Sequence, residues 1–368
     1  MLLAAVAAVA LLGVLAGRPA HAGTGTGVSP SVTPSSGIGL PAGLNKTGSG
    51  FLANAAYYQR ALKSRLWTPS PGGLVYKACS YSVPEGGEVD GIRNEILFPD
   101  GSVEHVSRCA YPQLVKPRSA SPGAKPAPTA TPAVSPAAAT TPPASTNGWQ
   151  YDFADYSSPG PLARFDAVFA TPASPISQDT DLANFMFDGI EDNVGDSIVQ
   201  PIVGWGDIYT GKNGVETSNN SGLYLWMGSY YLWGGNAVAA AIKKVNAGDT
   251  INTSVVATKC NGSGGGCTWE VYMTDNNTGA TSNIPVVSAP VYDTFYGGVY
   301  ESYNAATCYM LFGNAHLTWR QEAVFYFSSP GVYKRYTPKF GAEADASTCG
   351  MYAVNYTSEI GGDILWTQ

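Results

Sequence analysis

Short runs rich in Val, Ile, Tyr, Phe and Trp recur throughout residues 148–368, and Gly, Asn, Ser and Thr separate them. Apolar and polar residues alternate within many of these runs, and turn sequences such as DNNTG at 275–279 lie between them. Alternation with a period of two is typical of strands with one buried face. This part of the chain is therefore predicted to be all-β, an antiparallel sandwich or barrel with one sizeable core.

The start of the chain has the pattern of an export signal. Residues 1–17 form a short apolar run, and an Ala-x-Ala cleavage pattern follows it and ends at Ala22. Residues 1–22 are therefore predicted to be a signal peptide, since the run is too short for a membrane span. Because no later run is apolar enough to cross a bilayer, we expect a secreted protein that does not contact the membrane.

Composition divides the rest of the chain into three further parts. Residues 23–50 consist largely of Gly, Ser, Thr and Pro and are predicted to be disordered. Residues 51–116 are predicted to form a small α+β domain, with helical periodicity over 51–67 and a hairpin turn at 99–101. Residues 117–147, rich in Pro, Ala, Ser and Thr, are predicted to be an extended linker before the main domain, 148–368.

Charge also differs between these parts. Residues 1–147 carry 11 Lys and Arg against 6 Asp and Glu, whereas residues 148–368 carry 9 against 21. An acidic main domain argues against binding to nucleic acid, whose phosphates require a basic surface. The opposite charges could hold a basic prodomain, residues 23–147, on an acidic enzyme until low pH releases it. Alternatively, the surface charge reflects solubility alone.

Six cysteines agree with export to an oxidising compartment. No C-x-x-C spacing is present, so neither a zinc site nor a thioredoxin-type site is indicated. Pairing of neighbours along the chain would give three disulfides, although the sequence alone does not fix the connectivity. These pairs are Cys79–Cys109, Cys260–Cys267 and Cys308–Cys349.

Most familiar catalytic motifs are absent from the sequence. His21 lies in the signal peptide and His105 lies before the linker, so His316 is the only histidine of the main domain, on a predicted strand. There is no G-x-S-x-G elbow, H-E-x-x-H motif, EF-hand loop, G-x-G-x-x-G or Walker loop. We therefore expect no metal or cofactor, and carboxylates, amides and aromatic residues remain as candidates for chemistry.

Residues 183–206 predict a strand, a tight turn and a second strand. Gln200 lies in the middle of the second strand, where a buried amide would need partners for its oxygen and its NH2 group. It either faces a cleft or core, or lies on the solvent face of the strand. Pro201 removes a ladder donor directly after it, which suggests an edge strand or a bulge.

Glu301 is the second candidate. Tyrosines flank it in the sequence, and Gly297 and Gly298 precede it. Aromatic neighbours would provide an apolar wall that raises the pKa of this carboxyl, whereas the simpler alternative is a solvated residue. That alternative applies equally to Glu191, Glu270 and Glu322.

Five segments, in this order, resemble the glutamic peptidases of the eqolisin type, over roughly residues 149–330. That family has an acidic Gly-rich turn before an Ile-Leu-Gln strand, an aromatic strand, a Ser-Ala-Gly-Asp turn, a hairpin and a final strand that contains a catalytic Glu. The corresponding segments here are GIEDNVGDSIVQPIVGW at 189–205, LYLWMG at 223–228, NAGDTI at 246–251, TWEVYMTDNNTGATS at 268–282 and GGVYESY at 297–303.

The resemblance, which extends to the related neprosin-type peptidases, implies a concanavalin-like sandwich of two antiparallel sheets and a basic propeptide. It places Gln200 and Glu301 at the catalytic positions of a secreted, acid-acting endopeptidase. Leu225 stands where the family has a Glu, and tyrosines replace the Trp after the catalytic Glu. Either the chain is a distant member that tolerates Leu225, or it is an inactive relative.

Two functions therefore remain open. The first is a monomeric endopeptidase whose partner is a polypeptide substrate. The second is a catalytically inactive carbohydrate-binding module, because concanavalin-like sandwiches bind sugars through aromatic residues and the fold alone does not decide. Aromatic candidates for a substrate groove, which could equally belong to a core, are Trp205, Trp226, Trp233 and Tyr300.

Overall fold

The computed structural model describes most of the chain from residue 44 onwards. The described residues are 44–47, 50–53, 55–64, 66–111, 114–115, 146–155, 158–192, 197–206, 210–212, 215–217, 223–260, 266–288, 292–338, 341–344, 349–355 and 360–366. The predicted signal peptide and nearly all of the predicted linker lie outside this part of the chain. The described residues all belong to one compact unit.

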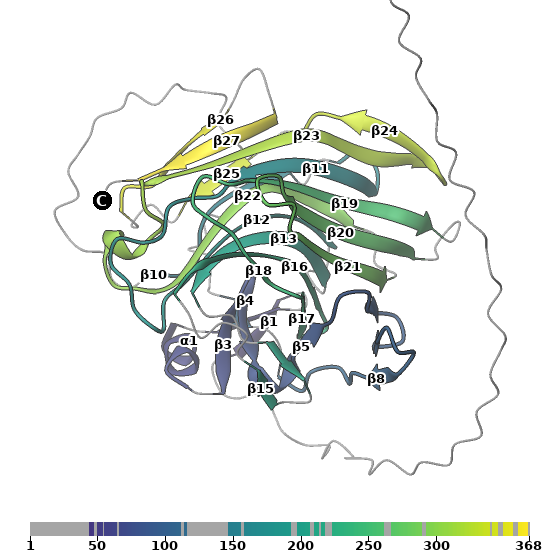
Figure 1. Cartoon of the computed structure of the whole chain (residues 1–368), viewed down its shortest axis with the longest axis horizontal. Coiled ribbons are helices and arrows are strands. Elements are labelled where there is room, and N and C mark those ends of the chain that lie inside the picture. The colour runs from purple at the N-terminus through teal and green to yellow at the C-terminus, as the bar shows by residue number, and fades with distance from the viewer. Residues whose placement is uncertain are drawn as a thin grey trace, which may run out of the picture. The chain divides into compact units, whose positions relative to one another are not determined.

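The main domain is a sandwich of two large sheets (Figure 1). We call the first of them sheet I. Its strands, in spatial order, are β25 (Gly341–Ala344), β10 (Thr146–Asp155), β22 (Tyr292–Ala305), β12 (Ala183–Asp192), β13 (Ser197–Gly206), β16 (Leu225–Trp233), β17 (Asn236–Ala240) and β5 (Ser80–Val83), and β18 (Lys243–Lys244) also pairs with β16. All of these pairs are antiparallel except β17 with β5.

We call the second layer sheet II. Its strands, in spatial order, are β26 (Tyr352–Asn355), β27 (Ile360–Leu365), β23 (His316–Ser329), β11 (Leu162–Ala170), β19 (Thr250–Cys260), β20 (Cys267–Asp275), β21 (Thr281–Ser288), β6 (Glu88–Asp90), β7 (Glu95–Leu97) and β8 (Val103–His105), and β24 (Val332–Tyr336) also pairs with β23. Two short strands, β14 (Thr210–Lys212) and β15 (Val215–Thr217), pair separately. The predicted antiparallel β-sandwich is thus confirmed.

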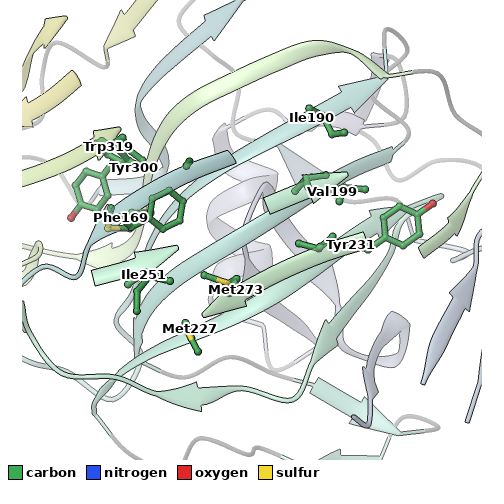
Figure 2. Close-up of a cluster of buried hydrophobic side chains, with 14 of the residues drawn as sticks. Phe169, Ile190, Val199, Met227, Tyr231, Ile251, Met273, Tyr300 and Trp319 are labelled. Carbon is green, nitrogen blue, oxygen red and sulfur yellow. The ribbon is translucent and has the colours of Figure 1, made fainter. Parts of the chain in front are cut away.

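Alternating side chains of the two sheets meet in the inter-sheet core, part of which Figure 2 shows. On β11, Phe165, Ala167 and Phe169 point into this core, whereas Arg164 and Asp166 face outward and pair at 2.9 Å. Alternation of this kind is the sequence pattern from which the strands of sheet II were predicted.

The central strands of sheet I are buried on both faces, and β13 has no exposed residue. Val199 and Val203 point into the inter-sheet core. Ile198 and Ile202 point to the other face, where they join a second apolar cluster. Burial on both faces explains why residues 197–206 are nearly all apolar, without the alternation seen on β11.

The described residues between 44 and 115, which we call the N-terminal segment, contribute the other side of that second cluster. The segment forms a small sheet with the order β1 (Leu44–Thr47), β2 (Gly50–Ala53), β9 (Leu114–Val115), β4 (Gly73–Tyr76) and β3 (Trp67–Ser70), a helix, α1 (Ala55–Leu62), and a 3-10 turn, η1 (Lys77–Cys79). The predicted α+β character of this segment is confirmed.

Two local predictions for this segment differ from the structure. The helix predicted over 51–67 is confined to α1, and β3 follows it. Residues 51–53 belong to β2 and β3 begins at Trp67, so strand pairing outweighs the helical periodicity at both ends of the predicted helix. Pro69 is tolerated because β3 is an edge strand. β1 lies inside the stretch predicted to be disordered, because backbone pairing with β2 does not require large apolar side chains.

The N-terminal segment also extends both large sheets. β5 pairs in parallel with β17 at the edge of sheet I, and β6 pairs in parallel with β21 in sheet II. The contact with sheet I is apolar. One ion pair crosses it, Lys243 with Glu85 at 3.8 Å, and here the N-terminal segment supplies the negative charge, the opposite of what the net charges suggest. Removal of this segment as a prodomain remains a prediction.

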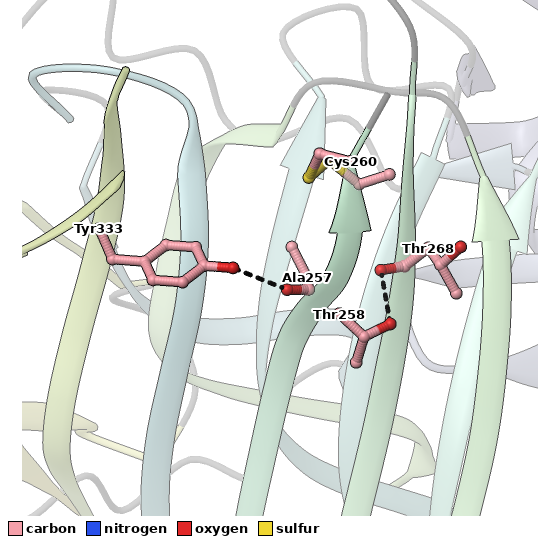
Figure 3. The surroundings of a disulfide bond; sticks show 6 residues. Ala257, Thr258, Cys260, Thr268 and Tyr333 are labelled. Carbon is pink, nitrogen blue, oxygen red and sulfur yellow. Dashed lines mark hydrogen bonds between the residues drawn. A yellow bond between two sulfur atoms is a disulfide. The ribbon is translucent and has the colours of Figure 1, made fainter. Parts of the chain in front are cut away.

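Three disulfides join the cysteines that are neighbours along the chain: Cys79–Cys109, Cys260–Cys267 and Cys308–Cys349. The second of them closes the hairpin between β19 and β20. Around it, Thr258 donates a hydrogen bond to the Thr268 carbonyl and Tyr333 donates one to the Ala257 carbonyl (Figure 3). Each disulfide lowers the entropy of the unfolded chain and so stabilises the fold.

The Cys260–Cys267 pair gives a direct test of the connectivity. Because Cys260 and Cys267 occupy paired positions of one ladder, we expect them to be joined in the purified protein. Peptide mapping without reduction should recover a single linked peptide that contains both residues. A free thiol at either position would contradict this expectation.

Candidate functional site

Gln200 and Glu301 lie on the same face of sheet I, the face opposite the inter-sheet core. Gln200 is on β13, Glu301 is on β22, and β12 runs between them. Both side chains have an exposed fraction of 0%. The alternatives in which either residue is solvated are therefore wrong.

Pro201, next to Gln200, lies in a central strand, so the edge-strand alternative is also wrong. On the β12 side, the register pairs Ile190 with Val199 and Phe187 with Ile202, and no pair is formed between them. Proline has no backbone N–H to donate, and Pro201 lies where the ladder between β12 and β13 is interrupted. Gly189 lies at this interruption, and a Cβ there would be only 3.5 Å from that of Gln200.

Both side chains bind a single peptide bond, the one between Pro71 and Gly72. Gln200 Nε2 donates to the carbonyl oxygen of Pro71 at 3.0 Å, and the N–H of Gly72 donates to Glu301 Oε2 at 2.6 Å. The two hydrogen-bond lengths and the C=O and C–N bonds of the amide add up to about 8 Å, so Gln200 Nε2 and Glu301 Oε2 lie no farther apart than this. The site therefore recognises both polar atoms of a backbone amide.

Pro71 and Gly72 form the tip of the hairpin between β3 and β4. Gly72 has φ +95°, a conformation that other residues rarely adopt, so glycine suits this turn. Next to the tip, Ser70 donates a hydrogen bond to the Tyr230 hydroxyl at 3.2 Å. Main-chain geometry thus presents the amide to the site with little dependence on the side chains of the tip.

Burial dominates the chemistry of Glu301. Desolvation raises the pKa of its carboxyl from 4.5 to about 8, and hydrogen bonds from Tyr303 and Gly72 oppose this rise. The Tyr303 hydroxyl donates to Oε1 while Gly72 donates to Oε2. In the intact chain Glu301 is therefore protonated at neutral and acid pH, when it cannot accept a proton from water.

The other titratable groups around Glu301 are tyrosines. Burial raises the pKa of Tyr58 and Tyr303, and it raises the pKa of Tyr230 to about 12. A charge on Glu301 raises all three further. Because these tyrosines stay neutral below pH 10, Glu301 alone among these groups changes charge between pH 4 and 9.

The raised pKa predicts how stability depends on pH. A folded pKa of about 8 against 4.5 means that folding takes up a proton at Glu301. Its contribution to stability is fully present below pH 4.5, falls as the pH rises, and is lost above about pH 8. Glu301→Gln should remove up to about 5 kcal/mol of this pH dependence.

The measurement is the free energy of unfolding by urea at pH 4, 6 and 9 for the wild type and for Glu301→Gln. The wild type should lose stability relative to the variant as the pH rises. Parallel curves across this range would show that Glu301 has an ordinary pKa in the folded chain.

Only one of the two polar atoms of the Gln200 side chain has a hydrogen-bond partner among the described residues. Its Oε1 is buried and has no hydrogen-bond partner among the described residues, whereas its Nε2 is used by Pro71. A buried acceptor without a partner costs free energy and often marks a functional site. This oxygen is placed to accept a hydrogen bond from a water or a substrate on the face that Glu301 shares.

The aromatic groove candidates fall on different faces. Trp205, Trp233 and Tyr300 belong to the inter-sheet core, so they point away from Gln200 and Glu301. Trp226 lies on the site face, where its ring is 5.9 Å from that of Phe185. Phe185 in turn pairs across the ladder with Glu301. Among the four candidates, Trp226 alone shares the face of the dyad.

Leu225 also points into the inter-sheet core. A carboxylate at this position would be buried between the sheets, on the far side of sheet I from Glu301. The departure from the family pattern at Leu225 therefore leaves the site face unchanged.

His316, the histidine of the main domain, is the first residue of β23 in sheet II and pairs with Asp363 at 3.0 Å. This agrees with a structural role. Among the residues that the structure describes, no three His, Cys, Asp or Glu side chains are grouped so as to hold a metal ion. The described helices include none with the length and apolar character of a membrane span.

Sequence reasoning missed the residues that complete the site. Tyr58, Tyr230 and Tyr303 surround Glu301, and the Pro71–Gly72 peptide fills the space between the two candidates. SPGG at 70–73, between two apolar runs, is a turn signature and could have predicted the hairpin. Nothing in the sequence indicates where that hairpin docks.

Comparison with known proteins gives distant structural matches. No family model matches the chain, and no curated protein matches it. Scytalido-glutamic peptidase bound to a peptide-based transition-state analogue matches with a TM-score of 0.38 and 12% identity. SCP-B, a member of the eqolisin family in complex with the tripeptide Ala-Ile-His, matches with a TM-score of 0.37 and 11% identity. Each match covers 61% of this chain and 98% of the other.

Proposed function

We propose that this protein is a secreted endopeptidase that hydrolyses peptide bonds with Gln200, Glu301 and an activated water. One observation supports the proposal most directly. Two buried side chains on one face of a sheet bind the carbonyl oxygen and the N–H of the same peptide bond. A site that selects both atoms of a backbone amide has the hydrogen-bonding pattern that a peptidase requires.

The chemistry follows from the two functional groups. With the site open to solvent, the Glu301 carboxylate takes a proton from a water, which then attacks the carbonyl carbon of the substrate. Gln200 Nε2 donates to the oxygen that becomes negative, and Oε1 helps to hold the water. The protonated Glu301 then gives its proton to the leaving nitrogen, the C–N bond breaks, and the carboxylate is restored.

An amide suits the second position for an electrostatic reason. Two carboxyl groups on this face would repel each other, and the pKa of one of them would rise strongly. Gln200 remains neutral at every pH, so it stabilises the developing charge without changing the ionisation of Glu301. An excess of acidic residues in 148–368 fits a protein that works in acid, where protonation relieves their mutual repulsion.

Digestion of an unfolded protein tests the proposal. The purified chain, intact and after limited cleavage in the linker, is incubated with a reduced, unfolded substrate protein between pH 3 and 8. New peptides found by mass spectrometry support a peptidase. If no form of the chain cleaves the substrate at any pH, the proposed function fails.

A carbohydrate-binding module is the competing function, and such modules stack sugars on exposed aromatic rings. Among the residues whose burial is described no tryptophan is exposed, and the exposed aromatic residues are Tyr111, Tyr272, Tyr309, Tyr333 and Tyr352. Binding of a glycan by a chain that cleaves nothing would restore this alternative.

A further inference from the structure

The hairpin tip occupies the space between the two candidate catalytic residues. No peptide bond among the described residues is cis, so the C=O of Pro71 and the N–H of Gly72 point in opposite directions. Gln200 therefore approaches the amide from one edge and Glu301 from the other. The amide lies where the proposed mechanism needs a water in contact with both side chains.

The amide is bound in a pose that does not favour its hydrolysis. A hydrogen bond from N–H places Glu301 Oε2 close to the amide plane. A water must attack the carbonyl carbon from above or below that plane, and the leaving nitrogen must take its proton there as well. In the amide plane, Glu301 accepts a hydrogen bond from the N–H of Gly72. From there it can neither activate a water for attack on the carbonyl carbon nor give a proton to the nitrogen.

Apolar contacts fix the hairpin in this position. Leu74 and Val75 on β4 are fully buried in the cluster that also contains Ile202 and Trp226 of sheet I. At the end of the hairpin away from the tip, the paired residues Trp67 and Tyr76 pack edge-on with their ring centroids 5.5 Å apart. The tip is thus held by the strands that carry it and by its two hydrogen bonds together.

We propose that the Pro71–Gly72 peptide is a built-in inhibitor of the Gln200–Glu301 site, bound as a substrate amide is bound but held in the plane and not cut. The proposal rests on the proposed function of that site. The protein is latent while the hairpin is seated, because both catalytic side chains are buried and already bound. Displacement of the tip activates it.

Displacement acts on Glu301 in two ways. It removes the peptide from the position of the water, and it admits solvent to the carboxyl. Burial is the largest cause of the raised pKa, so hydration returns the pKa towards its ordinary value of about 4.5 and generates the carboxylate that the mechanism needs.

An insertion at the tip tests the proposal. Gly-Ser-Gly-Ser placed between Pro71 and Gly72 breaks the shared amide while β3 and β4 are kept. The matched control carries the same insertion between Asp100 and Gly101, in an exposed turn where Gly101 has φ +84° and a Cβ added to it would meet no atom within 4 Å. A second variant, Leu74→Asp, removes the apolar anchor instead.

We expect the tip insertion and Leu74→Asp to raise kcat/KM on an unfolded polypeptide at least about tenfold, because the competent fraction of molecules increases. The control insertion should leave activity at the wild-type level. An intact wild type as active as the tip variant would overturn the proposal, and so would equal activation by the control. A new N-terminus at Gly72 in the acid-treated wild type would show that the bond is cut.

Amide hydrogen exchange at Gly72 provides a test that does not depend on activity. In the intact chain this N–H should be protected, and Glu301→Ala should speed its exchange at least about tenfold by removing the acceptor. Fast exchange of the Gly72 N–H in the wild type would overturn the proposal that the hairpin tip inhibits the site. Protection that depends on Glu301, in a protein of which no form cleaves any substrate, would instead refute the proposed function and, with it, the inhibition.

Discussion

Glu301→Gln should lower the rate of peptide hydrolysis by about 10² to 10⁴, the usual loss when a general base is removed. The two side chains have nearly the same shape: the Gln oxygen can accept the hydrogen bond from Gly72, and its NH2 group can donate to the Tyr303 hydroxyl, which turns from donor to acceptor. The fold should therefore persist while the group that moves the proton is lost. The effect should appear in kcat, because no substrate contact is removed.

The measurement is kcat/KM at acid pH in chains that also carry the tip insertion, so that latency does not hide the loss. Glu270→Gln is the matched control, because Glu270 lies on β20 in sheet II and hydrogen-bonds to Asn283. Equal activity of Glu301→Gln and the control would show that Glu301 is not the base.

Gln200→Ala should lower the rate by about 10² to 10³, the usual loss for one oxyanion donor. Gln200→Glu should be at least as inactive, although it differs from the wild type by one functional group. It removes the NH2 donor, and it sets a second carboxyl against Glu301, which keeps one of the two protonated. The pair of variants separates loss of the donor from loss of the side chain.

Steady-state assays of both Gln200 variants across pH 3 to 8 check this. Gln200→Glu should also change the shape of the pH profile, since a second carboxyl now titrates in the site. Full activity of Gln200→Ala would remove Gln200 from the mechanism and leave Glu301 without a partner.

The sandwich could be predicted because the sequence features that specify its strands and turns are local. Alternating residues along β11 and the turn at 275–279 show in the sequence which face is buried and where a hairpin reverses. The strand pair β12–β13 was predicted from its apolar runs and the turn formers between them, which are also local features. Helical periodicity over 51–67 was misleading because the pairing of β2 and β3 outweighed it.

The closure of the site could not be predicted because it depends on contacts between distant residues. Gly72 and Glu301 are 229 positions apart, and Pro71 and Gln200 are 129 apart. The parallel pairs β17–β5 and β21–β6 likewise join strands that no turn connects. The flanking tyrosines predicted the direction in which the pKa of Glu301 is shifted, but its complete burial beneath the hairpin follows from these distant contacts and has no local signature.

The positions of β5 and β6 set a condition on how the protein can be released from latency. Excision of residues 44–115 would strip β5 from sheet I and β6, β7 and β8 from sheet II, and it would leave the backbone N–H and C=O groups along one edge of β17 and of β21 unpaired. Bare strand edges of this kind are templates for pairing with other chains and promote aggregation. Lifting the hairpin tip alone would free Gln200 and Glu301 while both edges stay covered, so the segment that we propose as the inhibitor would also protect the protein from self-association.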